Sequence, residues 1–206
     1  MYWCKKCNVP LVRGLCDIHG QEGDAIFNVK ITPPGNVKPL FTKEGDKLRN
    51  LIDEVYGEGL GSKLIPKNRI VLLNKVPHAD LAYEVIVDGR VLGVWRYDVE
   101  RGHWSFLPHM EGARRLAALR AKKWVMVDEG AEKAIAREGK NLLAPGIIDY
   151  DQGIKEGDYV FVINEEWKAI ATGKVLSNFK DKILRRRGAV VKVKHFDEPR
   201  NAEFID

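Results

Sequence analysis

Three cysteines and a histidine near the start of the chain have the types and spacing of a metal site. Cys4 and Cys7 form a Cys-x-x-Cys pair, and Cys16 and His19 form a Cys-x-x-His pair after a short spacer. Two such pairs facing each other can close a tetrahedron around zinc, which prefers thiolate and imidazole ligands. We therefore expect a structural Zn2+ bound by Cys4, Cys7, Cys16 and His19. Free thiols beside a coincidental histidine are the alternative.

The predicted metal segment is too small to fold by itself. It has few apolar residues, so metal binding would supply its folding free energy, on the order of 10 kcal/mol in zinc-finger peptides. The short spacer leaves no room for a DNA-reading helix between the two pairs. A closed set of four ligands also favours a structural role over catalysis, and His19 in place of a fourth cysteine argues against a redox role.

Catalytic motifs are missing from the rest of the sequence. No Gly-x-Ser-x-Gly elbow, Walker loop or His-Glu-x-x-His segment occurs. The remaining histidines are scattered, at His78, His103, His109 and His195. Acids gather at Asp149, Asp151, Glu156 and Asp158, but they flank a predicted strand and a turn, where capping hydrogen bonds explain them. We expect a protein without catalytic activity.

Basic residues gather in two segments. Between residues 174 and 194 one acid, Asp181, accompanies the bases Lys174, Lys180, Lys182, Arg185, Arg186, Arg187, Lys192 and Lys194. A second cluster is Arg114, Arg115, Arg120, Lys122 and Lys123. The net charge of +5 is modest, so this distribution is more informative than the average. The alternatives are phosphate contact and a solvated helix face or linker.

The middle of the chain predicts an α+β unit. Residues 26–31 and 69–73 read as strands, and Thr42 precedes a predicted helix over residues 43–56. Asp88-Gly89 between residues 82–87 and 90–97 indicates a hairpin with a two-residue turn. A further strand at 103–107 and a helix at 111–122 follow. The glycines between 57 and 61 predict a turn, because no phosphate-loop signature follows them.

The last third of the chain predicts a compact β-barrel. A strand at 124–127 and a helix at 129–138 precede short apolar strands that are separated by glycines and bounded by basic residues. Its motifs are Leu142-Leu143-Ala144-Pro145-Gly146-Ile147, Ile154-Lys155-Glu156-Gly157-Asp158-Tyr159-Val160, Ala169-Ile170-Ala171-Thr172-Gly173 and Arg187-Gly188-Ala189-Val190-Val191-Lys192-Val193-Lys194-His195-Phe196.

In order and spacing these segments resemble the PUA domain, the pseudouridine synthase and archaeosine transglycosylase module. The resemblance implies binding of structured RNA, such as tRNA or rRNA, by a helix, the loop after it and the last strand. It places the RNA-binding residues at Arg137, Gly139, Lys140, Asn141, Pro145, Gly146, Arg185, Arg186, Arg187, Gly188, Lys192 and Lys194. Independently, Gly139 can bring a backbone amide close to a phosphate, and Lys140 adds charge beside it.

The order of cysteine pairs, α+β unit and barrel also resembles the N-terminal part of archaeal proteins classed with phosphoadenosine phosphosulfate reductases. Those proteins continue into a nucleotide-binding domain with a Ser-Gly-Gly-x-Asp-Ser loop, which this sequence lacks. Two interpretations follow. The first is a protein that binds RNA without catalysis and supports tRNA modification. The second is the recruiting region or a shortened relative of a reductase-like or sulfur-transfer enzyme with a catalytic partner protein. A protein–protein adaptor is a third.

The predicted fold class is α+β with three modules. They are a zinc-binding knuckle pair at 1–24, an α+β pre-PUA domain at 25–122 and a PUA-like mixed β-barrel at 123–198, followed by a polar tail at 199–206. A composition of 45% hydrophobic and 31% charged residues is typical of globular domains. No apolar run is long enough for a membrane span, and the start lacks a signal peptide, so we expect a cytoplasmic protein without a membrane partner.

Overall fold

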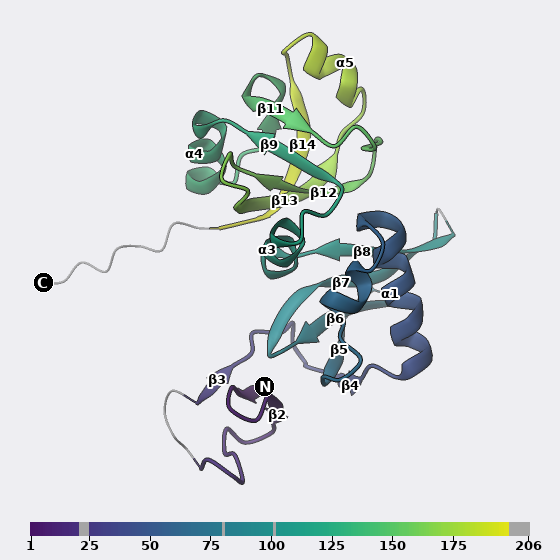
Figure 1. The fold of residues 1–206 in the computed structure, drawn as a ribbon, viewed down its shortest axis with the longest axis vertical. Coiled ribbons are helices and arrows are strands. Elements are labelled where there is room, and N and C mark those ends of the chain that lie inside the picture. The colour runs from purple at the N-terminus through teal and green to yellow at the C-terminus, as the bar shows by residue number, and fades with distance from the viewer. Residues whose placement is uncertain (21–24, 80, 101, 198–206) are drawn as a thin grey trace, which may run out of the picture. The chain divides into compact units, whose positions relative to one another are not determined.

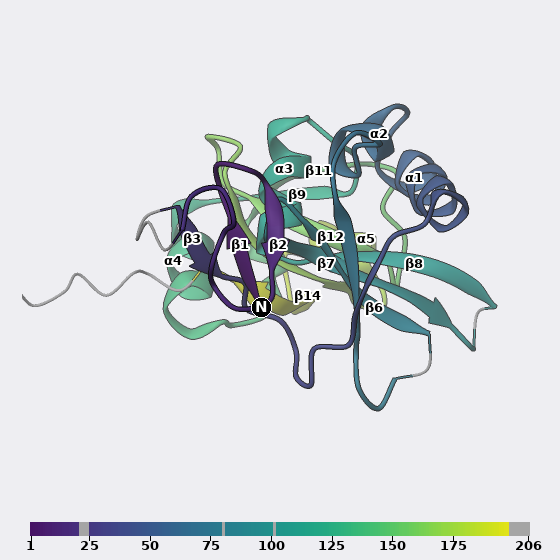
Figure 2. The same ribbon diagram turned by 90° about the horizontal axis from the view of Figure 1, so that it is seen from below.

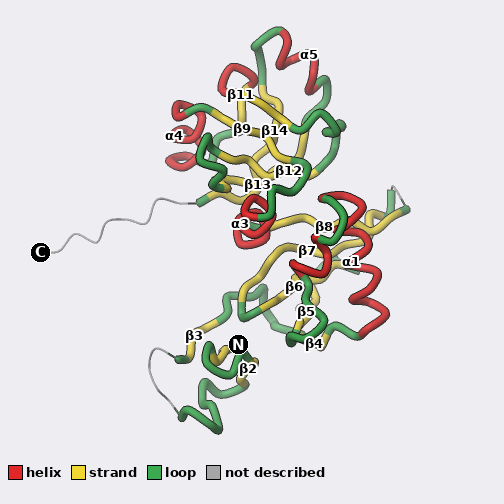
Figure 3. The backbone as a smooth tube through the Cα atoms, in the orientation of Figure 1, coloured by secondary structure: helices red, strands yellow, loops and turns green. Residues whose placement is uncertain are grey.

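A computed structural model describes residues 1–20, 25–79, 81–100 and 102–197 (Figure 1). The chain divides into two compact units, Met1–Gly112 and Ala113–Asp206, and each mixes helices with strands (Figure 3). The predicted mixed α+β class is therefore confirmed. The tail predicted at 199–206 lies outside the described residues. Within the described ranges, no helix is long and apolar enough to cross a membrane.

The first unit begins with a small three-stranded sheet. Its strands β1 (Tyr2–Cys4), β2 (Val9–Leu11) and β3 (Ile26–Asn28) are ordered β2-β1-β3, with both pairings antiparallel. Figure 2 shows the three strands side by side. Trp3 on the central strand is 1% exposed and packs with Val29, Leu72 and Ile86, and with Phe27 of β3 it anchors this small sheet to the rest of the unit.

A five-stranded antiparallel sheet forms the body of the first unit. Its order is β4 (Val37–Pro39), β5 (Val71–Lys75), β6 (Ala82–Val87), β7 (Arg90–Asp98) and β8 (His103–Pro108). Helix α1 (Thr42–Tyr56) presents Leu48, Ile52 and Tyr56 to the core, and the Tyr56 hydroxyl donates to the Phe106 carbonyl. The predicted hairpin is present, because Asp88 and Gly89 both adopt the positive φ angles that its turn requires.

Glycines after α1 do more than make a turn. Gly57 and Gly59 have positive φ, but helix α2 (Leu60–Leu64) begins directly afterwards, so the prediction of a turn through residue 61 is wrong in its second half. A Cβ on Gly61 would lie 2.2 Å from the Arg49 carbonyl oxygen. Gly61 therefore permits close contact between α1 and α2. The strand predicted at 69–73 lies at Val71–Lys75 instead, and helix α3 (Met110–Ala118) is shorter than the predicted 111–122.

A six-stranded sheet in the second unit curls into a nearly closed barrel. Its order is β10 (Leu142–Leu143), β14 (Ala189–Phe196), β13 (Ala169–Val175), β12 (Tyr159–Ile163), β9 (Trp124–Val127) and β11 (Ile147–Tyr150). The neighbours pair antiparallel except β9 and β12, which are parallel. Val125, Val160, Val162 and Val191 fill the barrel and are fully buried.

Helices and one short turn complete the barrel. Helix α4 (Glu129–Glu138) begins after Asp128, whose carboxylate accepts the Ala131 N–H at 2.7 Å, and its Ile135 enters the core. The strand at 124–127 and this helix match their predicted ranges. The 3-10 turn η1 (Ala144–Gly146) joins β10 to β11, and α5 (Phe179–Leu184) precedes β14. Figure 1 shows α4 and α5 as separate coils on the outside of the barrel.

Candidate functional site

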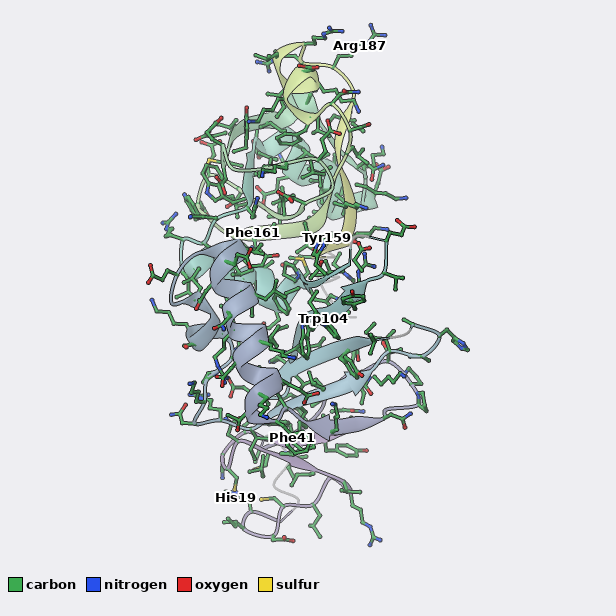
Figure 4. The ribbon with its side chains drawn as sticks, turned by 90° about the vertical axis from the view of Figure 1, so that its right-hand side faces the viewer. His19, Phe41, Trp104, Tyr159, Phe161 and Arg187 are labelled. Carbon is green, nitrogen blue, oxygen red and sulfur yellow. The ribbon has the colours of Figure 1, made fainter. Side chains whose placement is uncertain are left out.

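The four predicted metal ligands lie together. The Nδ1 atom of His19 is 3.7 Å from Cys4 Sγ, 3.3 Å from Cys7 Sγ and 3.6 Å from Cys16 Sγ. The Sγ atoms of Cys7 and Cys16 are 3.7 Å apart, and all four ligand atoms fall within 4.8 Å of one another. Figure 4 labels His19 in the loops beside the small sheet.

These distances fit a tetrahedral metal. Zn–S bonds of about 2.3 Å and a Zn–N bond of about 2.05 Å place tetrahedral ligands roughly 3.8 Å apart for two sulfurs and roughly 3.6 Å apart for sulfur and nitrogen. The three sulfur–nitrogen distances, 3.3, 3.6 and 3.7 Å, bracket the second value, and the sulfur–sulfur distance of 3.7 Å is close to the first. Backbone N–H groups of His19 and Ile18 also lower the pKa of the Cys16 thiol to about 6, and burial raises the pKa of Cys7 to about 11. The donor set can hold one soft cation.

The metal cluster is tied to the hairpin turn of the larger sheet. Asn8, between the two cysteine pairs, accepts the Trp3 indole N–H at 2.9 Å and donates to Asp88 at 2.8 Å. The Asp88 carboxylate also accepts a hydrogen bond from the Arg69 guanidinium at 2.8 Å. A Cβ on Gly89 would lie 2.6 Å from the Trp3 ring, so glycine is required there for contact as well as for the turn. These contacts therefore fix the position of the metal-ligand loops against the larger sheet of the first unit.

In the second unit, the predicted RNA-binding segments meet along one edge of the barrel, formed by residues 139–146 and 185–194. We call this the basic edge. Strand β10 pairs with β14 through Leu142 and Leu143, and the Asn141 side chain accepts the Val193 N–H at 3.2 Å. Further along, the Ala144 N–H donates to the Gly188 carbonyl at 2.9 Å. These contacts join the loop after α4 to the last strand, which lie far apart in sequence.

The predicted basic side chains of this edge reach solvent. Arg185, Arg186 and Arg187 follow α5 and are exposed, as are Lys192 and Lys194 on β14. Arg187 projects away from the barrel in Figure 4. Arg186 differs from its neighbours, because its guanidinium donates to the Pro145 carbonyl at 3.1 Å. It links the two halves of the edge, which leaves Arg185 and Arg187 as the better candidates for phosphate contact.

Lys140 lies at the other end of β14 from the arginines. Asn141, next to it, bonds to Val193, whereas the arginine run precedes Ala189 at the start of the strand. Lys140 also pairs with Glu138 at 2.6 Å, which offsets part of its charge. The exposed Arg137 lies nearby, in the last turn of α4. The predicted cations are thus spread along the strand, with Lys192 and Lys194 between the two ends.

The glycines of the edge have structural reasons for their identity. Gly139 ends α4 with φ of 58°, and its N–H donates to the Ile135 carbonyl at 2.8 Å. That bond occupies the Gly139 amide, which is therefore not available to a phosphate, contrary to the expectation from the sequence. A Cβ on Gly139 would lie 2.5 Å from the Phe196 ring, and one on Gly146 would lie 2.6 Å from Ala131. Only Gly188, with φ of 91°, faces a flexible side chain, Lys182.

Two basic residues near the edge, Lys174 and Lys182, were not among the predicted site residues; Lys182 donates to the Ala189 carbonyl at 3.1 Å. Lys174 on β13 lies directly opposite Lys192 on β14, and two like charges facing each other across a sheet cost stability. The alternation of residues along β13 could have shown that Lys174 points to the outer face. Its position opposite Lys192 depends on strand pairing, which the sequence does not reveal. By contrast, Asp151 and Asp158 accept backbone N–H groups of Lys123, Gly153 and Lys155, which confirms their role in turns.

Comparison with known proteins identifies the second unit. Residues 123–196 match the PUA domain family, so the chain contains a PUA domain and its barrel has the expected fold. The structure of the hypothetical protein PH0734.1 from Pyrococcus horikoshii superposes with a TM-score of 0.62 at 30% identity, covering 78% of this chain and 93% of that one. At this identity and coverage, the two proteins belong to one family.

Two curated relatives are longer than this chain. The uncharacterized protein MJ0066 of Methanocaldococcus jannaschii is 31% identical over 195 residues, which is 94% of this chain and 39% of the relative. The tRNA-guanine(15) transglycosylase of Thermococcus kodakarensis is 32% identical over 175 residues, covering 84% of this chain and 27% of the enzyme. The chain therefore spans well under half the length of either relative.

Proposed function

We propose that this protein binds structured RNA, tRNA or rRNA, through the basic edge of its PUA domain and catalyses no reaction itself. The observation that supports this most strongly is the meeting of the loop after α4 with β14, which gathers cations from two distant segments. Exposed Arg185, Arg187, Lys192 and Lys194 can each contact a phosphate. The similarity to a tRNA-guanine(15) transglycosylase favours tRNA as the ligand class.

Recognition through this edge would depend on backbone shape more than on base sequence. The major groove of A-form RNA is too deep and narrow for side chains, so a protein contacts phosphates and 2′-hydroxyls. The basic edge offers guanidinium and ammonium groups, which suit phosphates, and Asn141 has an amide N–H that can reach a ribose hydroxyl.

Binding of an unfractionated tRNA mixture at low salt tests the proposal. The variant R187Q/K192Q should bind several-fold more weakly than the parent protein. The variant K43Q/K47Q, which removes two exposed lysines from α1 and changes the net charge equally, should bind as the parent does. Equal weakening by both variants would mean that RNA affinity depends only on the net charge of the protein. No weakening by R187Q/K192Q would refute the proposed site.

We also propose that Cys4, Cys7, Cys16 and His19 hold a structural zinc ion. The spacing of the ligand atoms supports this role, and so does the hydrogen bond between Asn8 and Trp3, which fixes the loop between the cysteine pairs. Metal analysis of the purified protein should find one zinc per chain, and a chain with intact fold and no zinc would contradict the assignment.

A second candidate function is that of a recruiting region in a longer enzyme, related to reductase-like or sulfur-transfer proteins. It is favoured by the 39% share that the match occupies in MJ0066. In that case a catalytic partner or further domain would act on the RNA that the PUA domain holds. Co-purification with a nucleotide-binding protein would support this candidate, and an RNA that leaves the complex unmodified would count against it.

A further inference from the structure

We propose that the five-stranded sheet of the first unit carries a second RNA contact, an aromatic platform on which unpaired bases stack. The aromatic platform consists of Tyr83, Trp95, Tyr97 and Trp104 with Lys38 and Lys75 at its border. The inference rests on the proposed RNA-binding function and extends it from phosphates of folded RNA to nucleotides outside a helix.

Strand register puts the four aromatic side chains on one face of the sheet. Tyr83 on β6 lies opposite Trp95 on β7, and Tyr97 on β7 lies opposite Trp104 on β8. Directly opposed residues in an antiparallel pair share a face, as do residues two apart on one strand. The side chains therefore form a continuous strip across three strands, which no single segment of the sequence reveals.

Each ring contacts the next one along this strip. Trp95 and Trp104 lie 4.4 Å apart between ring centroids, with 31° between their planes. Tyr97 meets Trp104 at 5.5 Å, and Tyr83 meets Trp95 at 6.3 Å. Since the rings hold one another in place, stacking of a base immobilises them at a lower cost in side-chain rotamer entropy than it would a mobile side chain.

Helix α1 covers only part of this face. Tyr56 at the end of the helix packs edge-on against Phe106, which lies two residues beyond Trp104 on β8 and is buried. Trp95 is also buried, at 3% exposure, whereas Tyr83, Tyr97 and Trp104 remain half-buried. In the view of Figure 4 the labelled Trp104 is offset from α1 and is not covered by it. The strip thus continues from the core onto an accessible part of the sheet.

A buried donor and two lysines indicate the chemistry of the occupant. Within the described ranges, the indole N–H of Trp95 is buried and has no hydrogen-bond partner, which is rare and fits an acceptor on a bound molecule. Lys38 lies 5.3 Å from the Tyr83 ring centroid but also pairs with Glu44 at 2.6 Å. Lys75 lies opposite Tyr83, is exposed and has no ion pair among the described residues.

Aromatic faces bordered by cations suit single-stranded nucleic acid, because every base has a π-face and every nucleotide a phosphate. A protein partner would use the same apolar rings but would gain nothing from Lys75 unless it were acidic. The platform therefore has RNA with unpaired nucleotides as its ligand, and RNA binding that is unchanged in the platform variants would leave a protein partner as the alternative.

The test is fluorescence anisotropy with a short labelled single-stranded RNA, compared with the same RNA annealed into a duplex. The full chain should bind the single strand more tightly than the duplex. W104L should weaken single-strand binding about 5- to 140-fold, the range expected for losing one stacked base, and W104F should restore part of it. W167L, a matched loss of a half-buried tryptophan in the second unit, should have no effect.

K75E keeps the test valid if W104L disturbs the sheet. It leaves every ring in place and should weaken single-strand binding several-fold. The platform would be overturned if both single variants, K75E and W104L, bound the single strand as the parent does. Equal affinity for duplex and single strand would also overturn it. The basic-edge variant R187Q/K192Q separates the two proposals: it should weaken tRNA binding and leave W104L-sensitive binding of the single strand in place. If it weakens neither, the basic edge fails while the platform stands.

Discussion

Replacing His19 by asparagine should release the metal and unfold the start of the first unit. The imidazole nitrogen is the ligand atom that lies within 3.7 Å of all three sulfurs, so its loss opens the tetrahedron. His78 supplies a matched control. It is exposed, has φ of 58° and lies outside the cluster, and asparagine tolerates that backbone conformation.

The expected size of the effect follows from what else holds this segment. Metal binding contributes on the order of 10 kcal/mol in small zinc domains. The other anchors are Trp3, Phe27 beneath the Arg90 guanidinium, and the hydrogen bond from Asn8 to Asp88. The burial of Trp3 and its indole hydrogen bond to Asn8 together contribute about 2–4 kcal/mol. These few contacts contribute less than the metal, so the strands β1 to β3 should lose their fixed positions once the metal has left.

Two measurements on the purified protein read this out. A metallochromic dye should find one zinc per chain in the parent and in H78N, and little in H19N. Tryptophan emission should shift to the red in H19N, since Trp3 becomes exposed, while the PUA domain should keep its own thermal transition as a separate unit. An H19N protein that contains no zinc but keeps the emission maximum of the parent would refute the reasoning.

Two further substitutions test the packing that positions the sites. G139A should lower the free energy of unfolding by about 2–5 kcal/mol in urea titrations, because a Cβ there meets an aromatic ring at 2.5 Å in a left-handed backbone; G59A has the same backbone strain with open space around it and should lose only about 1–2 kcal/mol. E84A should cost the first unit about 2–4 kcal/mol, because the buried carboxylate accepts hydrogen bonds from Thr32 and Asn74. E84Q keeps one acceptor and should lose less in the same titration; equal losses would argue against this hydrogen-bond network.

Local signals allowed much of the fold to be predicted from sequence. The Asp88-Gly89 turn and the helix at 129–138 follow from residue preferences within a few positions, and the structure has both. Gly61 shows the limit of such reasoning. Its role is to let α1 approach α2 closely, which depends on tertiary contact and not on its neighbours in sequence.

The candidate sites divide in the same way. The metal ligands are near one another in sequence, so spacing alone was enough to group them. The basic edge required pairing between β10 and β14, and the aromatic platform required register across three strands. Long-range pairing is set by the whole barrel or sheet, and single segments do not encode it. For this reason Lys174 and the strip around Trp104 were not predicted as site residues.

The dependence of tRNA affinity on salt tests the central claim most directly. Replacing Arg185, Arg187 and Lys192 with glutamine removes three exposed cations of the basic edge and spares Arg186, which bonds to Pro145. Each lost phosphate contact should reduce the slope of log affinity against log salt by about 0.7–0.9, so the triple variant should lose roughly 2–3. A control that replaces Lys43, Lys47 and Lys63 should keep the parent slope. A parent slope in the basic-edge variant would contradict the account.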